Sequence, residues 1–131
     1  METIAIKAKK PFDLQRLKEI LSHDWGVEDS PDNTLVVHGA TSRAYLVLDP
    51  KLNGPEEFRL QIDYSDVEFV KGLLEKIAND STVTIDNDFG TLLPGSEFVA
   101  RCKTERGWDW RQQVPPRPFG NEGEGNTTRQ P

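Results

Sequence analysis

Apolar and polar residues alternate at the start of the chain. The segment 4–9 reads Ile-Ala-Ile-Lys-Ala-Lys, which predicts a strand with one buried face that ends before Pro11. The segment from Phe12 to Gly26 then carries apolar residues at helical spacing, with charged residues between them. Its apolar stripe consists of Leu14, Leu17, Ile20 and Leu21. We therefore predict a strand followed by an amphipathic helix that Gly26 terminates.

Three further strands are expected in the middle of the chain. The segment 28–33 has no apolar position and is predicted to be a polar loop. Two aliphatic runs, 34–38 and 43–48, are joined by Gly-Ala-Thr-Ser and predict a hairpin. Phe58, Leu60 and Ile62 alternate with polar residues, which predicts a third strand with one buried face. A wide turn is expected at 51–55, before this third strand.

A second helix follows the third of these strands. Ser65 and Glu68 have the spacing of a capping box, so Ser65 is the expected cap. The apolar stripe of this helix consists of Val67, Val70, Leu73, Leu74 and Ile77. The segment 82–85 predicts a last short strand and 90–94 a turn. A short helix over 96–102, capped by Ser96, is the final predicted element.

The predicted order β-α-β-β-β-α-β-α indicates an α+β fold. Two amphipathic helices with one apolar stripe each are best buried on one face of a mainly antiparallel sheet. A ferredoxin-like (split βαβ) variant with an extra strand would have this order. Residues 1–110 form the predicted single domain. Residues 111–131 are rich in Pro, Gly, Asn, Gln and Thr, which predicts a disordered tail.

The charge of the chain limits its partners. The 131 residues include 22 Asp and Glu and 16 Lys and Arg, which gives a formal net charge of −6. The segment 111–131 holds three Arg and two Glu, or +1, so the predicted domain carries 13 − 20 = −7. Such a domain repels nucleic-acid phosphates and anionic lipid and attracts cationic surfaces. We therefore expect a basic partner protein, and neither nucleic acid nor a membrane. The alternative is that the acidity only keeps a small protein soluble.

Cysteine content and hydropathy lead us to expect a cytoplasmic protein. Cys102 is the only cysteine, which excludes an intramolecular disulfide and a thiolate-based zinc site. The N-terminal segment lacks the apolar run of a signal peptide, and no stretch approaches the ~18 apolar residues of a membrane helix.

No group of residues has the pattern of a catalytic, cofactor or metal site. His23 and His38 lack a second His or Cys at ligand spacing. The segment 86–90, Asp-Asn-Asp-Phe-Gly, shares features with a calcium loop but lacks its acidic residues at positions five and twelve, which favours a turn. Cys102 is expected to be a small core residue. We therefore predict no enzyme and no cofactor.

Tryptophans and carboxylates provide a candidate partner-binding surface. Trp108 and Trp110 would share one face of an extended segment, where they either seal the edge of the core or present an exposed anchor. An anchor rimmed by carboxylates would suit a basic partner. The candidate partner-binding residues are Asp63, Asp66, Asp86, Asp88, Trp108 and Trp110.

Two resemblances bear on function. The segment 86–102, together with Trp108-Asp-Trp110-Arg111, resembles the C-terminal part of small bacterial proteins of unassigned role. In size, charge and lack of catalytic residues the chain also resembles immunity proteins of bacterial toxin systems. That likeness implies a protein that neutralises a toxin by steric and electrostatic occlusion. The alternatives are a small ligand-binding domain or enzyme with a site between sheet and helices, and an accessory domain of a larger assembly.

Overall fold

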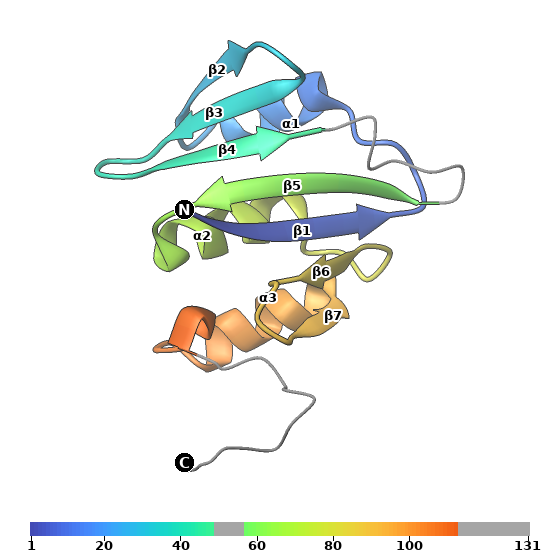
Figure 1. Cartoon of the computed structure of the whole chain (residues 1–131), viewed down its shortest axis with the longest axis vertical. Helices are drawn as coiled ribbons and strands as arrows, with labels where there is room; N and C mark the ends of the chain where they lie inside the picture. The colour runs from blue at the N-terminus through green and yellow to red at the C-terminus, as the bar shows by residue number, and fades with distance from the viewer. Residues whose placement is uncertain (49–56, 113–131) are drawn as a thin grey trace.

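The computed structural model describes residues 1–48 and 57–112, which form an antiparallel sheet with helices on one side (Figure 1). This confirms the predicted α+β class. In chain order the described elements are β1 (Glu2–Ala8), α1 (Leu14–Leu21), β2 (Gly26–Ser30), β3 (Thr34–His38), β4 (Arg43–Val47), β5 (Phe58–Tyr64), α2 (Val67–Ile77), β6 (Thr84–Asp86), β7 (Leu92–Pro94), α3 (Gly95–Thr104) and the 3-10 helix η2 (Trp110–Gln112). The predicted order therefore lacked two strands, β2 and β7. The predicted turn at 51–55 lies outside the described residues.

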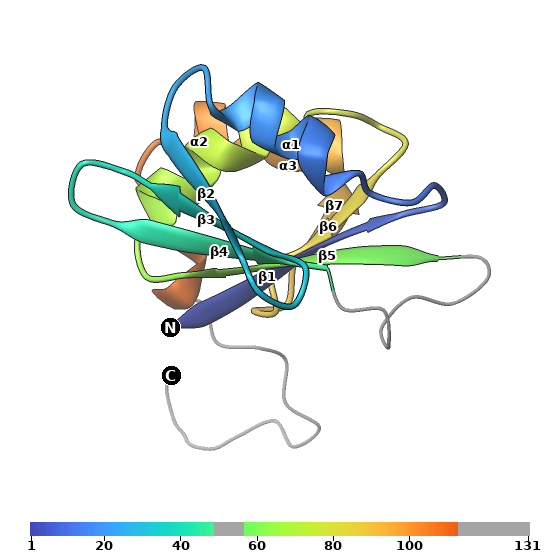
Figure 2. The same ribbon diagram turned by 90° about the horizontal axis from the view of Figure 1, so that it is seen from above.

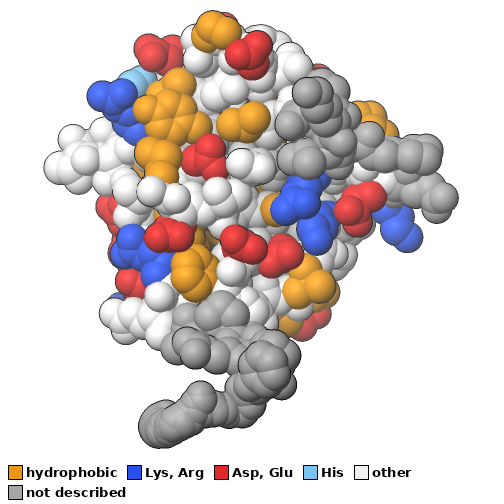
Figure 3. All heavy atoms as spheres, in the orientation of Figure 1, with side chains coloured by type: hydrophobic (Ala, Val, Ile, Leu, Met, Phe, Trp, Pro, Cys, Tyr) orange, Lys and Arg blue, Asp and Glu red, His pale blue; other side chains and the backbone are white. Residues whose placement is uncertain are grey.

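The strands are ordered β2-β3-β4-β5-β1-β6-β7, and each described neighbour pair is antiparallel. β1 is therefore an inner strand, with Ile6 opposite Leu60 of β5 on one side and opposite Ile85 of β6 on the other. The helices α1, α2 and α3 all lie on one face, here called the helix face (Figure 2). The opposite face, here called the open face, has no described helix on it and mixes charged, polar and apolar side chains (Figure 3).

The core lies between the sheet and the helices. In β5, Leu60, Ile62 and Tyr64 are fully buried, whereas the alternating Gln61 and Asp63 are only partly buried. This is the alternation predicted for this strand. The stripes predicted for the two helices are also buried in large part, with Leu17 and Leu21 from α1 and Val67, Val70, Leu73 and Leu74 from α2. Each helix contributes one apolar face because the sheet covers it from one side only.

The strand β2 occupies residues that were predicted to end the first helix and begin a polar loop. The helix α1 ends earlier, at Leu21, and the prediction that Gly26 terminates it is wrong. Asp32 and Asn33 adopt positive φ values of 63° and 56°, which suits the tight turn between β2 and β3. β2 lies at the edge of the sheet, where Glu28 and Asp29 remain exposed. An edge strand with exposed side chains on both faces leaves no apolar alternation in the sequence.

Two predicted helix caps are wrong. Asp66, rather than Ser65, caps α2, because its carboxylate accepts bonds from the backbone N–H groups of Glu68 (2.9 Å) and Phe69 (3.3 Å). α3 begins one residue before Ser96, and no side chain caps it. Its N-terminus follows directly from β7, a three-residue strand within the segment predicted to be a turn.

The start of α3 requires a glycine. A Cβ atom on Gly95 would lie much closer to the carbonyl oxygens of Ala78 and Asp80 than van der Waals contact allows. The backbone N–H of Gly95 also donates to the carbonyl oxygen of Val83 (2.8 Å). Gly95 therefore lets α3 start against the end of α2, and this contact places the C-terminal part of the chain beside the core.

The described fold extends past the predicted end of the domain at residue 110. Arg111 and Gln112 belong to η2, and Arg111 makes the contacts with Ser65 described below. The remaining residues of the predicted tail, 113–131, lie outside the described residues.

Candidate functional site

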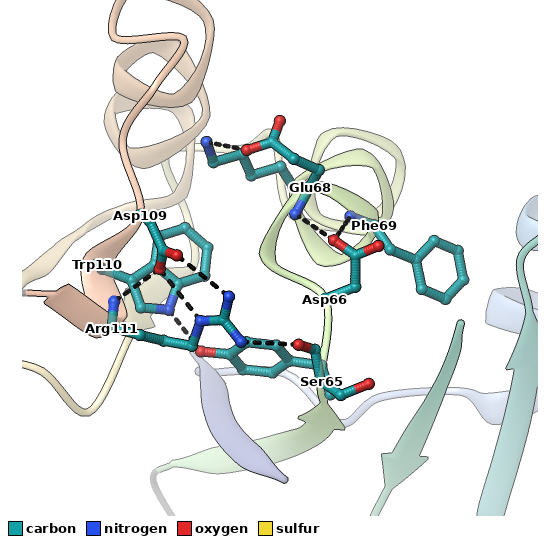
Figure 4. Close-up of polar contacts among 9 residues, drawn as sticks. Ser65, Asp66, Glu68, Phe69, Asp109, Trp110 and Arg111 are labelled. Carbon is teal, nitrogen blue, oxygen red and sulfur yellow. Dashed lines mark hydrogen bonds and ion pairs between the residues drawn. The ribbon is translucent and has the colours of Figure 1, made fainter. Parts of the chain in front are cut away.

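The junction between β5 and α2 brings together three segments that are far apart in the sequence. Asp66 caps α2 with one carboxylate oxygen and accepts a bond from the hydroxyl of Ser42 (3.0 Å) with the other. Ser42 belongs to the connection between β3 and β4, so this bond ties that hairpin to the helix. The C-terminal segment reaches the same junction from α3 (Figure 4).

Arg111 fastens the C-terminal segment to the junction. Its Nη1 donates to the backbone carbonyl oxygen of Ser65 (2.7 Å), and its Nε and Nη2 donate to the carboxylate of Asp109 (both 3.1 Å; Figure 4). The bonds from Arg111 lower the pKa of Asp109, and Asp109 in turn raises the pKa of the guanidinium. We call Arg111, Asp109 and the carbonyl group of Ser65 the clamp. Its role is structural, because the donors of Arg111 are bonded to the acceptors of Asp109 and Ser65.

The two predicted tryptophan anchors lie in the core. Trp110 is fully buried and its indole N–H donates to the hydroxyl of Tyr64, while Trp108 is 9% exposed. Both rings pack on Phe98, with ring centroids 5.4 Å and 5.2 Å apart, and the guanidinium of Arg101 lies 3.9 Å from the centroid of the Trp108 ring. This arrangement agrees with the alternative in which the pair seals the core edge. A role as partner-binding anchors stays a prediction, and it would require this segment to move.

The four predicted carboxylates do not form one cluster. Asp63 lies on the open face, where it accepts bonds from Thr3 (2.9 Å) and Gln61 (3.2 Å) of the same sheet. Asp86 is 3.5 Å from the ammonium of Lys7, and the exposed Asp88 stands in the turn after β6 with φ of 64°. Asp66 is engaged in capping α2. A role in partner binding stays a prediction for all four.

A partly exposed aromatic pair was not among the predicted site residues. Trp25, between α1 and β2, meets Phe69 of α2 edge to face, with ring centroids 5.9 Å apart. Both side chains are half-buried. Gly72 lies under Trp25, since a Cβ atom added to Gly72 would be 3.5 Å from Cζ2 of that ring. Gly39 lies against Phe69, since a Cβ atom added to Gly39 would be 3.1 Å from Cε1 of that ring. The sequence feature that could have indicated this pair is Trp25, a large aromatic residue that is not part of the apolar stripe of the first helix.

A carboxylate residue precedes each member of this aromatic pair in the chain. Asp24 precedes Trp25 and lies 3.3 Å from the ammonium of Lys76. Glu68 precedes Phe69, and its 71% exposed side chain lies 2.8 Å from the ammonium of Lys71. The pair therefore combines two half-buried rings with two carboxylates that are their neighbours in the chain. Asp24 holds a surface ion pair, which contributes little to stability, whereas Glu68 pairs with the buried Lys71.

The larger described hollow lies at the end of the β3–β4 hairpin. It has a volume of about 480 Å³ and is lined by Met1, His38, Gly39, Ala40, Thr41, Ser42, Arg43, Tyr45 and Ser65. Its lining carries hydroxyls, one imidazole and one guanidinium. His38 lies 3.4 Å from Glu28, and the hydroxyl of Ser42 is bonded to Asp66, so neither positions the other as a nucleophile and base would.

A smaller hollow of about 150 Å³ lies between α2 and α3 and contains Cys102. Burial raises the pKa of the Cys102 thiol to about 11. The thiolate is the nucleophilic form, so at neutral pH this cysteine is held in its unreactive state. Cys102 packs against the core as predicted.

Within the described residues, no group of three or more His, Cys, Asp or Glu side chains could hold a metal ion. In the turn 86–90, side-chain oxygens instead accept bonds from the turn's own backbone. The side-chain oxygen of Asn87 accepts from the backbone N–H groups of Phe89 (2.8 Å) and Thr91 (3.1 Å), and Asp86 accepts from Asp88 (2.9 Å). Across the same part of the chain, every helix is too short or too polar to cross a bilayer.

The comparisons with known proteins find little similarity. No family model matches the chain, and no curated protein matches it. Among solved structures, the chain is similar to the NMR structure of PA4090 from Pseudomonas aeruginosa, with 15% sequence identity and a TM-score of 0.37. That match covers 66% of this chain and 96% of the other.

Proposed function

We propose that the chain is a protein-binding module for a basic partner protein, held at the Trp25–Phe69 pair. The observation that carries this proposal is the edge-to-face pair itself, half-buried and 5.9 Å between centroids, with the exposed Asp24 and Glu68 directly preceding its two residues in the chain. Aromatic side chains that are partly exposed and fixed in orientation are typical of interface hot spots. Carboxylates beside them favour a cationic partner.

The ion pairs formed by Asp24 and Glu68 differ in how readily a partner's cation can replace their lysines. Glu68 and Asp24 are paired with Lys71 and Lys76, and three of these four side chains are more than 40% exposed. The Asp24–Lys76 pair is exposed on both sides, and a surface pair of this kind contributes about 0–1 kcal/mol, so a partner's Arg or Lys replaces Lys76 at small cost. The net charge of −6 also speeds the approach of a basic protein at low salt.

Within this class we propose an immunity protein that neutralises a bacterial toxin by steric and electrostatic occlusion. Such a protein needs a stable surface of complementary charge and no reactive group of its own. The clamp at the β5–α2 junction and the buried tryptophans supply rigidity next to the aromatic pair. The partner would be a toxin domain with a basic surface around its active site.

A small-ligand module is the second candidate. The hollow of about 480 Å³ at the β3–β4 hairpin supports it, because hydroxyls and a guanidinium line one concave surface. Binding there would depend on Arg43 and leave Phe69 variants unaffected.

We further propose that β4-β5-β1-β6, with α1 and α2, corresponds to the ferredoxin-like split βαβ unit. In this interpretation the β2–β3 hairpin is an insertion between α1 and β4, and β7 with α3 is an addition after β6. The position of β5 between β1 and β4 supports this assignment.

Two matched pairs of variants test the proposed function. Phe69→Ala and Glu68→Gln alter the proposed surface, while Phe89→Ala and Glu97→Gln make the same chemical changes at a half-buried and an exposed position elsewhere. The wild-type chain and each variant are immobilised, and the proteins that each captures from an extract of the source organism are quantified. The protein captured most strongly by wild type is then purified, and its affinity for wild type and for each variant is measured by titration. We expect a basic protein whose affinity falls at least about tenfold for the first pair only, and falls further as salt rises.

Equal affinity of all four variants for the purified partner would contradict the proposed surface. A purified partner with an acidic surface, bound independently of salt, would contradict the proposed class of partner. Circular dichroism of each variant shows whether the fold is retained.

A further inference from the structure

The two edges of the sheet differ in how well they are protected. β7 has three residues, ends in Pro94 and continues directly into α3. Proline has no N–H to donate, and a short strand offers few backbone groups, so this edge is blocked. β2 has five residues, contains no proline and pairs with β3 along its whole length. No described element lies beyond β2 (Figure 1).

The free edge of β2 is strongly acidic. The segment 24–37 contains Asp24, Glu28, Asp29 and Asp32 and no Lys or Arg. Glu28 and Asp29 have side chains that are 65% and 71% exposed. Glu28 reaches toward His38 on the open face, and Asp29 reaches toward Lys18 of α1 on the helix face. Both faces of the edge therefore carry a carboxylate.

We propose that the β2 edge accepts an extended, basic segment of the partner as an eighth strand. This inference rests on the proposed function, since it takes the partner to be basic. Alternate residues of β2 direct their backbone N–H and C=O groups away from β3, which leaves them available to an added strand. Main-chain bonds would supply affinity, and the carboxylates would select the sequence.

The register of β2 defines the segment that fits. Gly26, Glu28 and Ser30 share the open face, because they lie opposite His38, Val36 and Thr34. Trp25, Val27 and Asp29 alternate onto the helix face, where Val27 packs on the core. The added strand therefore carries a Lys or Arg beside Glu28 on one face. On the other face it carries an apolar residue beside Val27 and Trp25 and a second basic residue beside Asp29.

A second copy of the chain fits this edge poorly. Antiparallel pairing of two β2 strands centred on Glu28 would place Glu28 opposite Glu28, with the Asp29 residues nearby. Like charges directly opposite one another destabilise a strand pair. The charge of the edge thus disfavours self-association and favours a basic segment.

A defined peptide tests strand addition without knowledge of the partner. The probe is a blocked nine-residue peptide of alternating lysine and valine, titrated into the full chain labelled with ¹⁵N; it supplies the basic row beside Glu28 and the apolar row beside Val27, and leaves out the basic residue beside Asp29. Two further peptides have the same sequence with N-methyl groups on either all lysines or all valines. In an added strand only one of these two sets of amides faces β2.

We expect one N-methylation pattern to weaken binding at least about tenfold and the other to leave it nearly unchanged, since two or more main-chain bonds are lost in only one case. The amides of β2 should become slower in hydrogen exchange, and those of β7 should not change. Glu28→Lys should weaken the binding of the lysine–valine peptide, whereas Glu97→Lys on α3 should leave its binding unchanged.

Other outcomes separate this inference from the proposed function. If both N-methylated peptides bind as the parent does, and Phe69→Ala weakens all three, strand addition is wrong and the basic-partner surface stands. If a glutamate peptide binds as well as the lysine peptide, the charge preference is wrong and both proposals fail. Binding that perturbs only residues outside β2 would overturn the edge proposal.

Discussion

The hydroxyl of Tyr64 accepts a hydrogen bond from the indole N–H of Trp110, 46 residues later in the chain. Both side chains are fully buried, and their rings meet edge to face with centroids 6.1 Å apart. Tyr64 ends β5 and Trp110 begins η2, so this bond joins the sheet to the C-terminal segment beside the bond from Arg111 to Ser65. Burial raises the pKa of Tyr64, which keeps its hydroxyl protonated.

Removal of this hydroxyl should destabilise the fold. In Tyr64→Phe the buried indole N–H loses its partner, which costs about 1–3 kcal/mol in the free energy of unfolding. Urea denaturation followed by tryptophan fluorescence measures the change. Tyr45→Phe, at a half-buried position on the open face, is the matched control and should be nearly neutral. Equal effects of the two substitutions would show that the Tyr64–Trp110 bond contributes nothing.

The cap of α2 gives a second prediction. Asp66→Ala removes the acceptor of two backbone N–H groups and should cost about 1 kcal/mol, with loss of the Ser42 bond adding to it. Ser65→Ala should lie within about ±0.5 kcal/mol, because the side chain of Ser65 is exposed and only its carbonyl oxygen is used. Thermal and urea unfolding of both variants compare them directly. A larger loss for Ser65→Ala would contradict the assignment of the cap.

Gly95→Ala should be among the more damaging small substitutions. The added methyl meets two backbone carbonyl oxygens, which cannot rotate away, so a loss of about 1–3 kcal/mol or more is expected. Gly107→Ala is the control, because no atom lies within 4 Å of the added carbon. The measurement is the urea midpoint of each variant. A stable Gly95→Ala protein would mean that α3 can start further from α2.

Alkaline pH should reveal the buried thiol. The pKa of Cys102 is about 11 when folded and near 9.0 when exposed, so the folded state keeps a proton that the unfolded state loses in this range. This contribution to stability is complete below pH 9 and is lost as the pH rises from 9 to 11. The urea midpoint should therefore fall less steeply over this range in Cys102→Ala than in wild type. Identical slopes would indicate that the thiol is accessible to water.

Several of the elements that were predicted from sequence have one buried face. α1, α2 and β5 carry apolar stripes at periods of 3.6 or 2, because the sheet or the helices cover one side of each. β2 was missed for the opposite reason: Glu28 and Asp29 are exposed at an edge, and only Val27 packs on the core. β7 was missed because three residues ending in proline give no period.

The candidate site depended on tertiary contacts that the sequence does not encode locally. Ser65 and Asp66 are adjacent and both can cap a helix, so only the backbone geometry decides between them. The spacing of Trp108 and Trp110 allowed either burial or exposure, and the contacts of Trp110 with the rings of Tyr64 and Phe98 bury it. Trp25 and Phe69 meet because Gly72 leaves room for the Trp25 ring against α2.

The inner position of β1 has a consequence for the order of folding. β2, β3, β4 and β5 are successive antiparallel strands, so their pairings are local and can form early. β1 precedes all of them in the chain, yet both of its neighbours, β5 and β6, follow much later. During synthesis from the N-terminus, β1 therefore leaves the ribosome long before either partner exists. Until β5 emerges, the backbone N–H and C=O groups of β1 stay unpaired and offer other nascent chains and chaperones an edge to bind.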